Sequence, residues 1–256
     1  MRTVVLQSHR ETHRPPWLDR CLQSVQAWAA ARGHSYRFEG DAFFQRVPDW
    51  YRQKAAGRPM VIADLARLRW AQAVLAEGAD RVIWLDADVL VFAPEQLTLI
   101  TEDGYGLGRE VWVQPDGARW KARAKIHNAV LVFEPGNPLL AFYAHACERL
   151  VARYVGTPPP HLVGPRLLGV LHNLIGGAVN DTVGTFGPPV LRDVLAGDGP
   201  ALEACQRGSQ GPVAAANLGA SLVGAGYDGI ALNDAQMGQA VERLLAHGAA
   251  WFAQPA

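Results

Sequence analysis

The sequence has few cysteines and no net charge. Its three cysteines, Cys21, Cys147 and Cys205, lie far apart and form no C-x-x-C pair. Zinc or dithiol chemistry is therefore not indicated, and we expect reduced, structural thiols. The 24 basic and 24 acidic side chains cancel, so the chain lacks the basic excess that is typical of proteins that bind nucleic acid or anionic lipid. We expect no nucleic-acid partner.

Long hydrophobic runs are also missing. No apolar run approaches the roughly 20 residues that span a bilayer, and residues 1–10 hold only a short apolar strand instead of the apolar core of a signal peptide. We therefore expect a cytoplasmic protein without a transmembrane segment. The composition, 49% hydrophobic and 19% charged over 256 residues, is globular and fits one large α/β domain.

Alternating strand and helix patterns predict this α/β fold. Residues 4–6 form a short apolar run that is typical of a buried parallel strand, and Pro15-Pro16 opens an amphipathic helix. A second helical pattern over residues 65–75 leads into an apolar strand at 82–85. We expect further strands at 36–38, 111–113 and 129–133 and further helices at 138–154 and 233–248. We expect a loop at 41–57, and loops with short helices over the Gly/Pro-rich stretch 156–211.

Two carboxylates follow the strand at 82–85. Asp86-Ala87-Asp88 lies at its carboxyl end, where open α/β sheets place their ligands. An isolated D-x-D more often caps a turn, but here apolar segments both precede and follow the pair, where unpaired charge is costly. Oxygen ligands of this kind suit Mg²⁺ or Mn²⁺, which usually take further ligands from substrate phosphates. A metal there would offset the charge on a departing diphosphate.

A wider set of residues resembles a known family. The runs Ala63 to Leu68 and Val82 to Val89 look like the sugar-binding region with the DXD motif in glycosyltransferases of the GT-A fold. The likeness extends to Gln7-Ser8 and Gly33 to Tyr36 upstream, and to Asn128 to Leu131, Pro135 to Pro138 and Gly164-Pro165 downstream. It implies a Rossmann-like mixed sheet flanked by helices in a single domain, with residues 1–135 as the nucleotide-sugar-binding half and 136–256 as the acceptor-side half.

The resemblance also implies roles for single residues. Asp88 would bind Mn²⁺ or Mg²⁺ directly, and Asp86 would contact the metal through water or hold the donor. Asp64 and Arg67 lie three residues apart on one helix face, so both can reach the same ligand. Arg67 would bind the diphosphate or sugar, and Asp64 would bind the sugar hydroxyls. The alternative is that the two residues form an exposed ion pair on the helix. The implied catalytic set is Asp86, Asp88 and Arg67, and the donor-binding set is Gln7, Asp64, Arg67, Asp86, Ala87 and Asn128.

The last third of the chain shows no clear match to the family pattern. A further metal ligand is expected from that region, with candidates at His172-Asn173, Asn217 and Ser221; each also fits a structural role. Asn180-Asp181 is a candidate for acceptor contact or catalysis, and His127 and His161 have no assigned role. Three tryptophans in or near loops, Trp50, Trp112 and Trp120, could stack on a sugar or base, although burial in the core is the default for tryptophan. The alternating basic side chains could bind a phosphate-bearing acceptor or form a solvated strand face; they are Arg119, Lys121, Arg123 and Lys125.

The predicted function is transfer of a sugar from a UDP- or GDP-sugar to a saccharide or other hydroxyl acceptor, with retention by family analogy. One alternative is an aspartate-nucleophile phosphohydrolase, which also places D-x-D after an apolar strand but usually near the start of the domain and with a small or hydroxyl residue soon after the second aspartate, where this chain has Val89-Leu90-Val91. A nucleotidyltransferase is disfavoured because no glycine-rich phosphate loop follows the first strand. A non-catalytic module that keeps the fold and binds carbohydrate is the other alternative.

Overall fold

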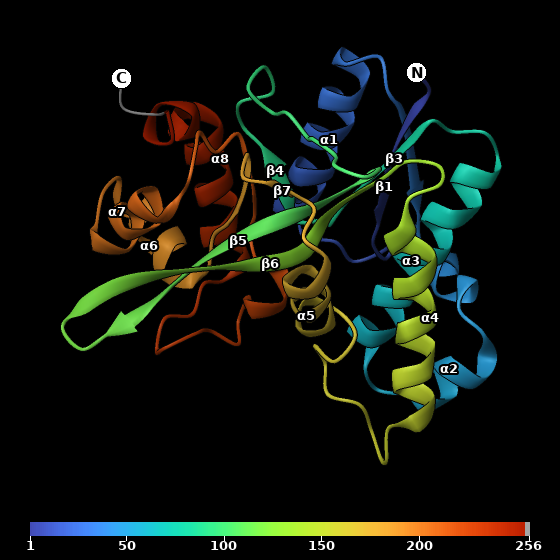
Figure 1. The fold of residues 1–256 in the computed structure, drawn as a ribbon. Coiled ribbons are helices and arrows are strands. Elements are labelled where there is room, and N and C mark those ends of the chain that lie inside the picture. Colours follow the sequence, from blue (N-terminus) through green and yellow to red (C-terminus); the bar gives the residue numbers. More distant parts are fainter. Residues whose placement is uncertain (254–256) are drawn as a thin grey trace.

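The computed structural model describes residues 1–253 and has a mixed six-stranded sheet at its centre (Figure 1). The strand order is β2-β1-β3-β6-β5-β7. β1 runs parallel to β2 and β3, β6 is antiparallel to both β3 and β5, and β7 is parallel to β5. The strands are β1 (Thr3–Ser8), β2 (Ser35–Glu39), β3 (Arg81–Leu85), β5 (Tyr105–Asp116), β6 (Arg119–Phe133) and β7 (Ala178–Asn180).

A second, three-stranded sheet has the order β4-β9-β8. It consists of β4 (Val89–Val91), β8 (Val183–Thr185) and β9 (Ala215–Asn217). β4 follows β3 in the chain after a short turn, so residues 86–88 connect the two sheets. This turn carries the D-A-D motif and places it where neither sheet covers it completely.

Two hydrophobic cores form on opposite faces of the large sheet. Val5 points into one core, whereas Val4 and Leu6 point into the other, as the two-residue period of a strand requires. The first core is closed by α1 (Pro16–Ala31), α6 (Pro188–Ala196), α7 (Pro200–Gly208) and α8 (Asp234–Trp251). The second is closed by α2 (Asp49–Lys54), α3 (Pro59–Ala76), α4 (Pro138–Arg153) and α5 (Pro165–Ile175). A mixed α/β sheet flanked by helices is thus confirmed.

Some boundaries differ from the sequence prediction. The expected loop at 41–57 holds the 3-10 helix η1 (Asp41–Arg46) and α2, because Phe43 and Tyr51 have to be buried in the second core. α3 begins at Pro59, before the predicted helix, and its amphipathic signal is weak because Asp64 and Arg67 are buried along with its apolar residues. The predicted strands at 111–113 and 129–133 are parts of one long β5–β6 hairpin that extends from the sheet (Figure 1).

The Gly/Pro-rich part after residue 156 contains short helices, as expected, together with the strands β7, β8 and β9, which were not predicted, and the 3-10 helix η2 (Ala220–Leu222). The last helix, α8, starts at a capping box formed by Asn233 and Gln236. No helix within residues 1–253 has the length and apolarity to cross a membrane.

Candidate active site

The D-A-D turn is held by backbone hydrogen bonds to both neighbouring strands. Asp86 N donates to Ala129 O at 2.9 Å, which continues the β3–β6 pairing, and Val89 N donates to Asp86 O at 3.1 Å. On the other side Leu218 N donates to Asp88 O at 3.0 Å. The two carboxylates therefore sit on a backbone that leaves one sheet and joins the other.

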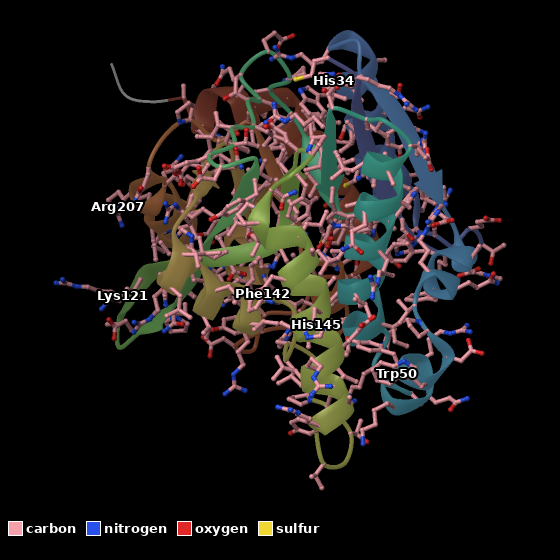
Figure 2. The ribbon with its side chains drawn as sticks, turned by 45° about the vertical axis from the view of Figure 1, so that its right-hand side comes forward. His34, Trp50, Lys121, Phe142, His145 and Arg207 are labelled. Carbon is pink, nitrogen blue, oxygen red and sulfur yellow. The ribbon has the colours of Figure 1, made fainter. Side chains whose placement is uncertain are left out.

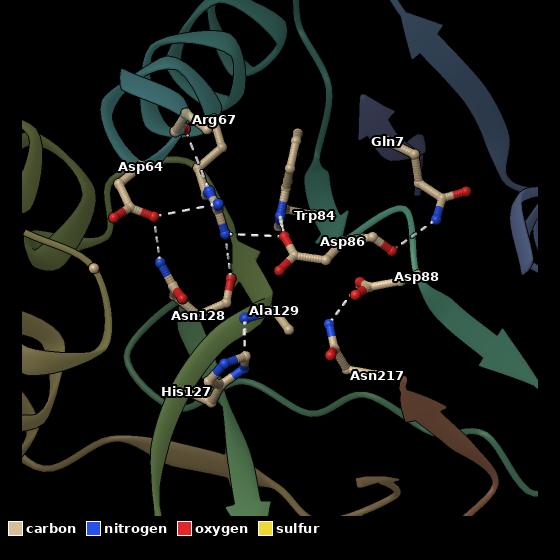
Figure 3. A network of polar contacts seen from close by, with 12 residues as sticks. Gln7, Asp64, Arg67, Trp84, Asp86, Asp88, His127, Asn128, Ala129 and Asn217 are labelled. Carbon is tan, nitrogen blue, oxygen red and sulfur yellow. Dashed lines mark hydrogen bonds and ion pairs between the residues drawn. The ribbon is translucent and has the colours of Figure 1, made fainter. Parts of the chain in front are cut away.

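Arg67 fixes the first carboxylate of this turn (Figure 3). Its Nη1 donates to Asp86 Oδ1 at 3.0 Å and to Asn128 O at 2.8 Å, and its Nη2 lies 3.2 Å from Asp64 Oδ1. The guanidinium also lies over the Trp84 ring, with 5.0 Å from Cζ to the ring centroid. Because Arg67 is 8% exposed and Asp64 4%, this is a buried network and not the exposed helix ion pair that the sequence alone allowed.

Two further donors complete the network around Asp64 and Asp86. Asn128 Nδ2 donates to Asp64 Oδ1 at 2.7 Å, and Trp84 Nε1 donates to Asp86 Oδ1 at 2.7 Å. Both Arg67 and Trp84 contact the Asp86 carboxylate through Oδ1. A carboxylate oxygen has two lone pairs, so Oδ2 of Asp86 keeps its acceptor capacity for a ligand in the cavity.

Asp88 is bound from the small sheet. Asn217 Nδ2 donates to its Oδ1 at 2.7 Å, and Ala220 N donates to its Oδ2 at 2.7 Å. Asn217 is held in turn, since its Oδ1 accepts from Gly219 N at 3.0 Å. One hydrogen bond to each oxygen of Asp88 leaves lone pairs for a cation. The amide nitrogen of Asn217, and not its oxygen, thus faces the carboxylate.

The protonation behaviour of these groups follows from burial and from their neighbours. Burial raises the pKa of Asp64 to about 6 against the opposing effect of Arg67, and burial together with the Asp86 charge raises the pKa of Asp88 to about 6. Burial alone would lower the pKa of Arg67, but Asp86 and Asp64 outweigh it and raise that pKa. A cation beside Asp88 would relieve the like-charge repulsion between the two carboxylates.

Gly164 comes into close contact with the same network. A Cβ atom at this position would lie 2.4 Å from Asp64 Oδ2 and 3.1 Å from Asn128 Nδ2. Real Cβ atoms do not approach so closely, so glycine allows the chain before α5 to pack directly on the Asp64–Asn128 pair. The segment before α5 thereby helps to fix the side chains of Asp64 and Asn128.

A cavity of about 600 Å³ opens above these residues, a volume within the range of small-molecule and cofactor sites. Its polar lining includes Asp64, Arg67, Asp86, Asp88, Asn128 and Asn217, and its walls come from several elements. The remaining lining residues come from the end of β1 and the loop after it (Ser8, His9, Arg10), α1 (Leu18), the η1 region (Gly40, Asp41, Phe43, Phe44), the start of α3 (Pro59, Met60, Ala63), β3 and the turn after it (Trp84, Ala87), β6 (His127), the segment before α5 and its first residue (Pro160, His161, Pro165), and the η2 region (Gly219, Ala220, Ser221).

The carboxylate pair fits a hard divalent cation. Both aspartates line the cavity and retain free lone pairs, and oxygen donors are what Mg²⁺ and Mn²⁺ prefer. Residues 1–253 contain no cluster of three or more His, Cys, Asp or Glu side chains suited to a metal. A cation held by this pair would need water and substrate oxygens for the rest of its coordination shell.

Most predicted site residues come together in this cavity. Asp64, Arg67, Asp86, Ala87, Asp88 and Asn128 all line it. Gln7 does not: it is fully buried, its Nε2 donates to Asp86 O at 3.0 Å, and its Oε1 accepts from Tyr36 at 3.0 Å. Gln7, which was predicted to contact the donor, thus lies outside the cavity lining, and its side chain supports the D-A-D turn from behind.

The candidates from the last third separate into two groups. Asn217 and Ser221 line the cavity, and Asn217 contacts Asp88 through its amide nitrogen. His172 and Asn173 lie on α5 outside the cavity lining, with His172 Nδ1 3.0 Å from Gly176 O. Asn180 accepts from Ile100 N at 2.7 Å, and Asp181 pairs with Arg109. His172, Asn180 and Asp181 therefore have structural contacts outside the cavity lining, and Asn173 also lies outside it.

The other aromatic and basic candidates also lie away from the cavity lining. Trp50 is 43% exposed on α2, and Lys121 extends from the β5–β6 hairpin (Figure 2). Trp112 packs edge-on against Tyr227, and Trp120 lies under the Arg192 guanidinium. Lys121 and Lys125 pair with Asp116 and Glu110, while Arg119 and Arg123 are exposed on the same strand. The solvated-strand interpretation holds for this stretch.

Sequence reasoning missed several cavity residues. Trp84 binds Asp86, and the two-residue strand period, which puts residues 84 and 86 on one side, was the available signal. His127 and His161, left without a role, both line the cavity. Phe43 and Phe44 were assigned to a loop, and no local pattern pointed to their place beside Trp84, on which Phe43 stacks at 5.4 Å between ring centroids.

No family model matches the sequence, and no curated protein matches it. Solved structures with similar folds include the galactosyltransferase LgtC in complex with donor and acceptor sugar analogues, at 16% identity and TM-score 0.46, covering 94% of this chain and 95% of that one. Mouse xyloside xylosyltransferase 1 aligns at 11% identity and TM-score 0.46, covering 86% and 98%. A glycosyltransferase involved in glycosylation of the major capsid of PBCV-1 aligns at 14% identity and TM-score 0.38, covering 62% and 77%. At this level of similarity the function has to be inferred from the site residues.

Proposed function

We propose that the chain is a metal-dependent glycosyltransferase of GT-A type that uses a nucleotide-sugar donor. The observation that carries this proposal is the arrangement at the D-A-D turn. Two carboxylates with free lone pairs line a cavity of about 600 Å³, and the buried Arg67 lies 3.0 Å from the first of them. Partial coordination by the chain suits a metal that also binds a substrate diphosphate.

Each residue has a role in this proposal. Asp88 and Asp86 hold Mn²⁺ or Mg²⁺, which supplies Lewis-acid stabilisation of the diphosphate leaving group. Arg67 keeps Asp86 in place and adds positive charge at the same end of the cavity. The Asp64–Asn128 pair offers an acceptor and an amide to the hydroxyls of the donor sugar. Residues 1–135 hold the donor, and residues 136–256 shape the acceptor side through Pro160, His161 and Pro165.

The proposed reaction breaks the bond between the anomeric carbon of the sugar and the diphosphate oxygen. The nucleoside diphosphate leaves with the bonding electron pair, the acceptor hydroxyl oxygen forms the new bond from the same face, and its proton passes to the departing phosphate. No dedicated strong base is required. Retention is part of this proposal, and an inverted product anomer, seen by NMR of the product, would refute it.

Calorimetric titration of UDP and GDP, with and without Mn²⁺, tests the donor site on wild type and Asp88→Ala. We expect manganese-dependent binding of either UDP or GDP, which identifies the base of the donor nucleotide, and loss of that binding in Asp88→Ala. Arg149→Ala is the matched control, because Arg149 is exposed on α4, outside the cavity lining. No binding of either nucleotide to the folded protein would contradict the proposal.

The same preparations distinguish the alternatives. A non-catalytic module that keeps the fold would bind the donor without releasing nucleoside diphosphate, so Mn²⁺-dependent hydrolysis of UDP- or GDP-sugars supports an enzyme. An aspartate-nucleophile phosphohydrolase would instead release phosphate from a phosphomonoester such as p-nitrophenyl phosphate. We expect the first activity and not the second.

A further inference from the structure

A second cavity adjoins the candidate active site. It has a volume of about 460 Å³ and lies between the loop that follows β1 and the segment that follows β9. The two cavities share His9, Arg10, Leu18 and Ala220 as lining residues. A substrate in the first cavity can therefore extend into the second past Ala220, whose N–H binds Asp88.

The lining of this cavity is rich in nitrogen donors. His9, Arg10, His13 and Arg14 all come from one loop, and Asp234 is the one carboxylate among the lining residues. Asp234 Oδ1 already accepts from Trp17 Nε1 at 2.8 Å. The cavity also lies at the start of α1, where the helix dipole adds partial positive charge.

One of the two arginines is held in place, and the other is free to bind a ligand. Arg14 donates to Asp19 Oδ1 at 2.8 Å and to Arg10 O at 3.1 Å, and its guanidinium lies 5.3 Å from the centroid of the Phe38 ring. Arg10 has no ion-pair partner among residues 1–253. Its exposed guanidinium thus retains all five donors at the junction of the two cavities.

A histidine ring nitrogen at the same junction also lacks a partner. Nδ1 of His9 is buried and makes no hydrogen bond within the described part of the chain. Buried polar atoms in native structures are nearly always satisfied, so an unpartnered one indicates a missing ligand or water. A free arginine and an unsatisfied imidazole nitrogen, side by side in sequence and lining both cavities, form an incomplete site.

We infer that the second cavity is a phosphate subsite, in which Arg10, His9 and Arg14 bind a phosphate group of a substrate held in the main cavity. Arginine binds phosphate oxygens in a bidentate fashion, and the histidines supply additional N–H donors. The phosphate belongs either to the donor diphosphate or to a phosphorylated acceptor. The inference extends the proposed glycosyl transfer, but the geometry of the subsite does not depend on the metal.

Inorganic pyrophosphate is the probe, titrated calorimetrically without metal into wild type, Arg10→Ala and the matched control Arg149→Ala. We expect saturable binding to wild type and to Arg149→Ala, weakened about tenfold in Arg10→Ala and reduced by added KCl. Arg10→Lys should retain part of the affinity, because the charge remains while the bidentate fork is lost. Equal affinity in wild type and Arg10→Ala, or no saturable binding to folded wild type, would overturn the inference.

A competition experiment identifies the source of the phosphate. If UDP or GDP with Mn²⁺ displaces pyrophosphate, the subsite takes the donor diphosphate; if both bind together, it takes a phosphate of the acceptor. Both results support the subsite. Pyrophosphate binding without any manganese-dependent nucleotide binding would leave the subsite in place and refute the donor site, so the two failures are distinguishable.

Discussion

Arg67 Nη1 lies 3.0 Å from Asp86 Oδ1 and joins the middle of α3 to the end of β3. The two residues are 19 positions apart in sequence, yet the buried guanidinium determines which way the first carboxylate of the D-A-D turn points. A charged pair of this kind couples stability to function, because the Arg67 guanidinium that compensates the carboxylates also lines the cavity.

Arg67→Ala should lower the free energy of unfolding by about 3–5 kcal/mol, because Asp64 loses its partner while it remains buried. Urea denaturation measures the change. The double variant Asp64→Asn/Arg67→Met should recover part of the loss, since Asp64, the more deeply buried of the two carboxylates that Arg67 contacts, no longer carries a charge. Arg149→Ala should stay within about 0.5 kcal/mol of wild type. If Arg67→Ala also changed the free energy of unfolding by less than about 0.5 kcal/mol, Arg67 would not be the compensating partner of a buried carboxylate.

Asn217→Ala should weaken manganese-dependent nucleotide binding by roughly tenfold and should also lower stability, because Asn217 is buried and Asp88 loses a hydrogen bond. The variant removes the 2.7 Å hydrogen bond that orients Asp88, and a hydrogen bond to a charged group contributes about 1.5–3 kcal/mol. Calorimetry with and without Mn²⁺ measures the effect. Asn180→Ala is the comparison, because Asn180 lies outside the cavity lining; if both variants bind nucleotide equally well, Asn217 does not position Asp88.

Gly164→Ala should disturb the site, whereas Gly169→Ala should not. The first substitution puts a methyl group 2.4 Å from Asp64 Oδ2 and should cost about 1–3 kcal/mol of stability along with donor binding. The second lies in α5 with nothing within 4 Å of its Cβ, so it should stabilise the helix by up to about 1 kcal/mol. Thermal melts and nucleotide titration check both; unchanged donor binding in Gly164→Ala would argue against the close packing on Asp64.

His127 should make folding sensitive to acid. Burial lowers its pKa to about 4, from an ordinary value near 6.5, and its Nδ1 accepts from Ala129 N at 3.1 Å. Above about pH 6.5 the ring is neutral in both folded and unfolded chains. As the pH falls below 6.5, His127 binds a proton in the unfolded chain but stays neutral in the folded chain, so stability is lost down to about pH 4.

The His127 contribution can be isolated as the difference between wild type and His127→Gln. Asp64 and Asp88, whose pKa values are raised to about 6, change stability in the opposite direction over this range but are common to both proteins. Between pH 8 and pH 5 wild type should lose about 2 kcal/mol relative to the variant. A difference that stays constant with pH would show that His127 is not buried in its neutral form.

Local patterns in the sequence determined the secondary elements that carry the site. The apolar run before Asp86 and the helical spacing of Asp64 and Arg67 are short-range signals, because strand and helix periods are properties of neighbouring residues. They were sufficient to predict that two carboxylates follow a buried strand and that an aspartate and an arginine share a helix face. The α/β class followed from the alternation of these elements, whereas the mixed sheet was implied by the resemblance to the GT-A glycosyltransferases.

Only the tertiary structure decided what these residues contact. Asn217 is 129 positions from Asp88, and the two meet because β9 pairs with β4, a pairing that no local period encodes. The sequence places Gln7 at the end of a strand. The pairing of β1 with β3 brings its side chain to the backbone of Asp86, outside the cavity lining. Periodicity assigns a face to each side chain, whereas the partner on that face depends on which distant strands come together.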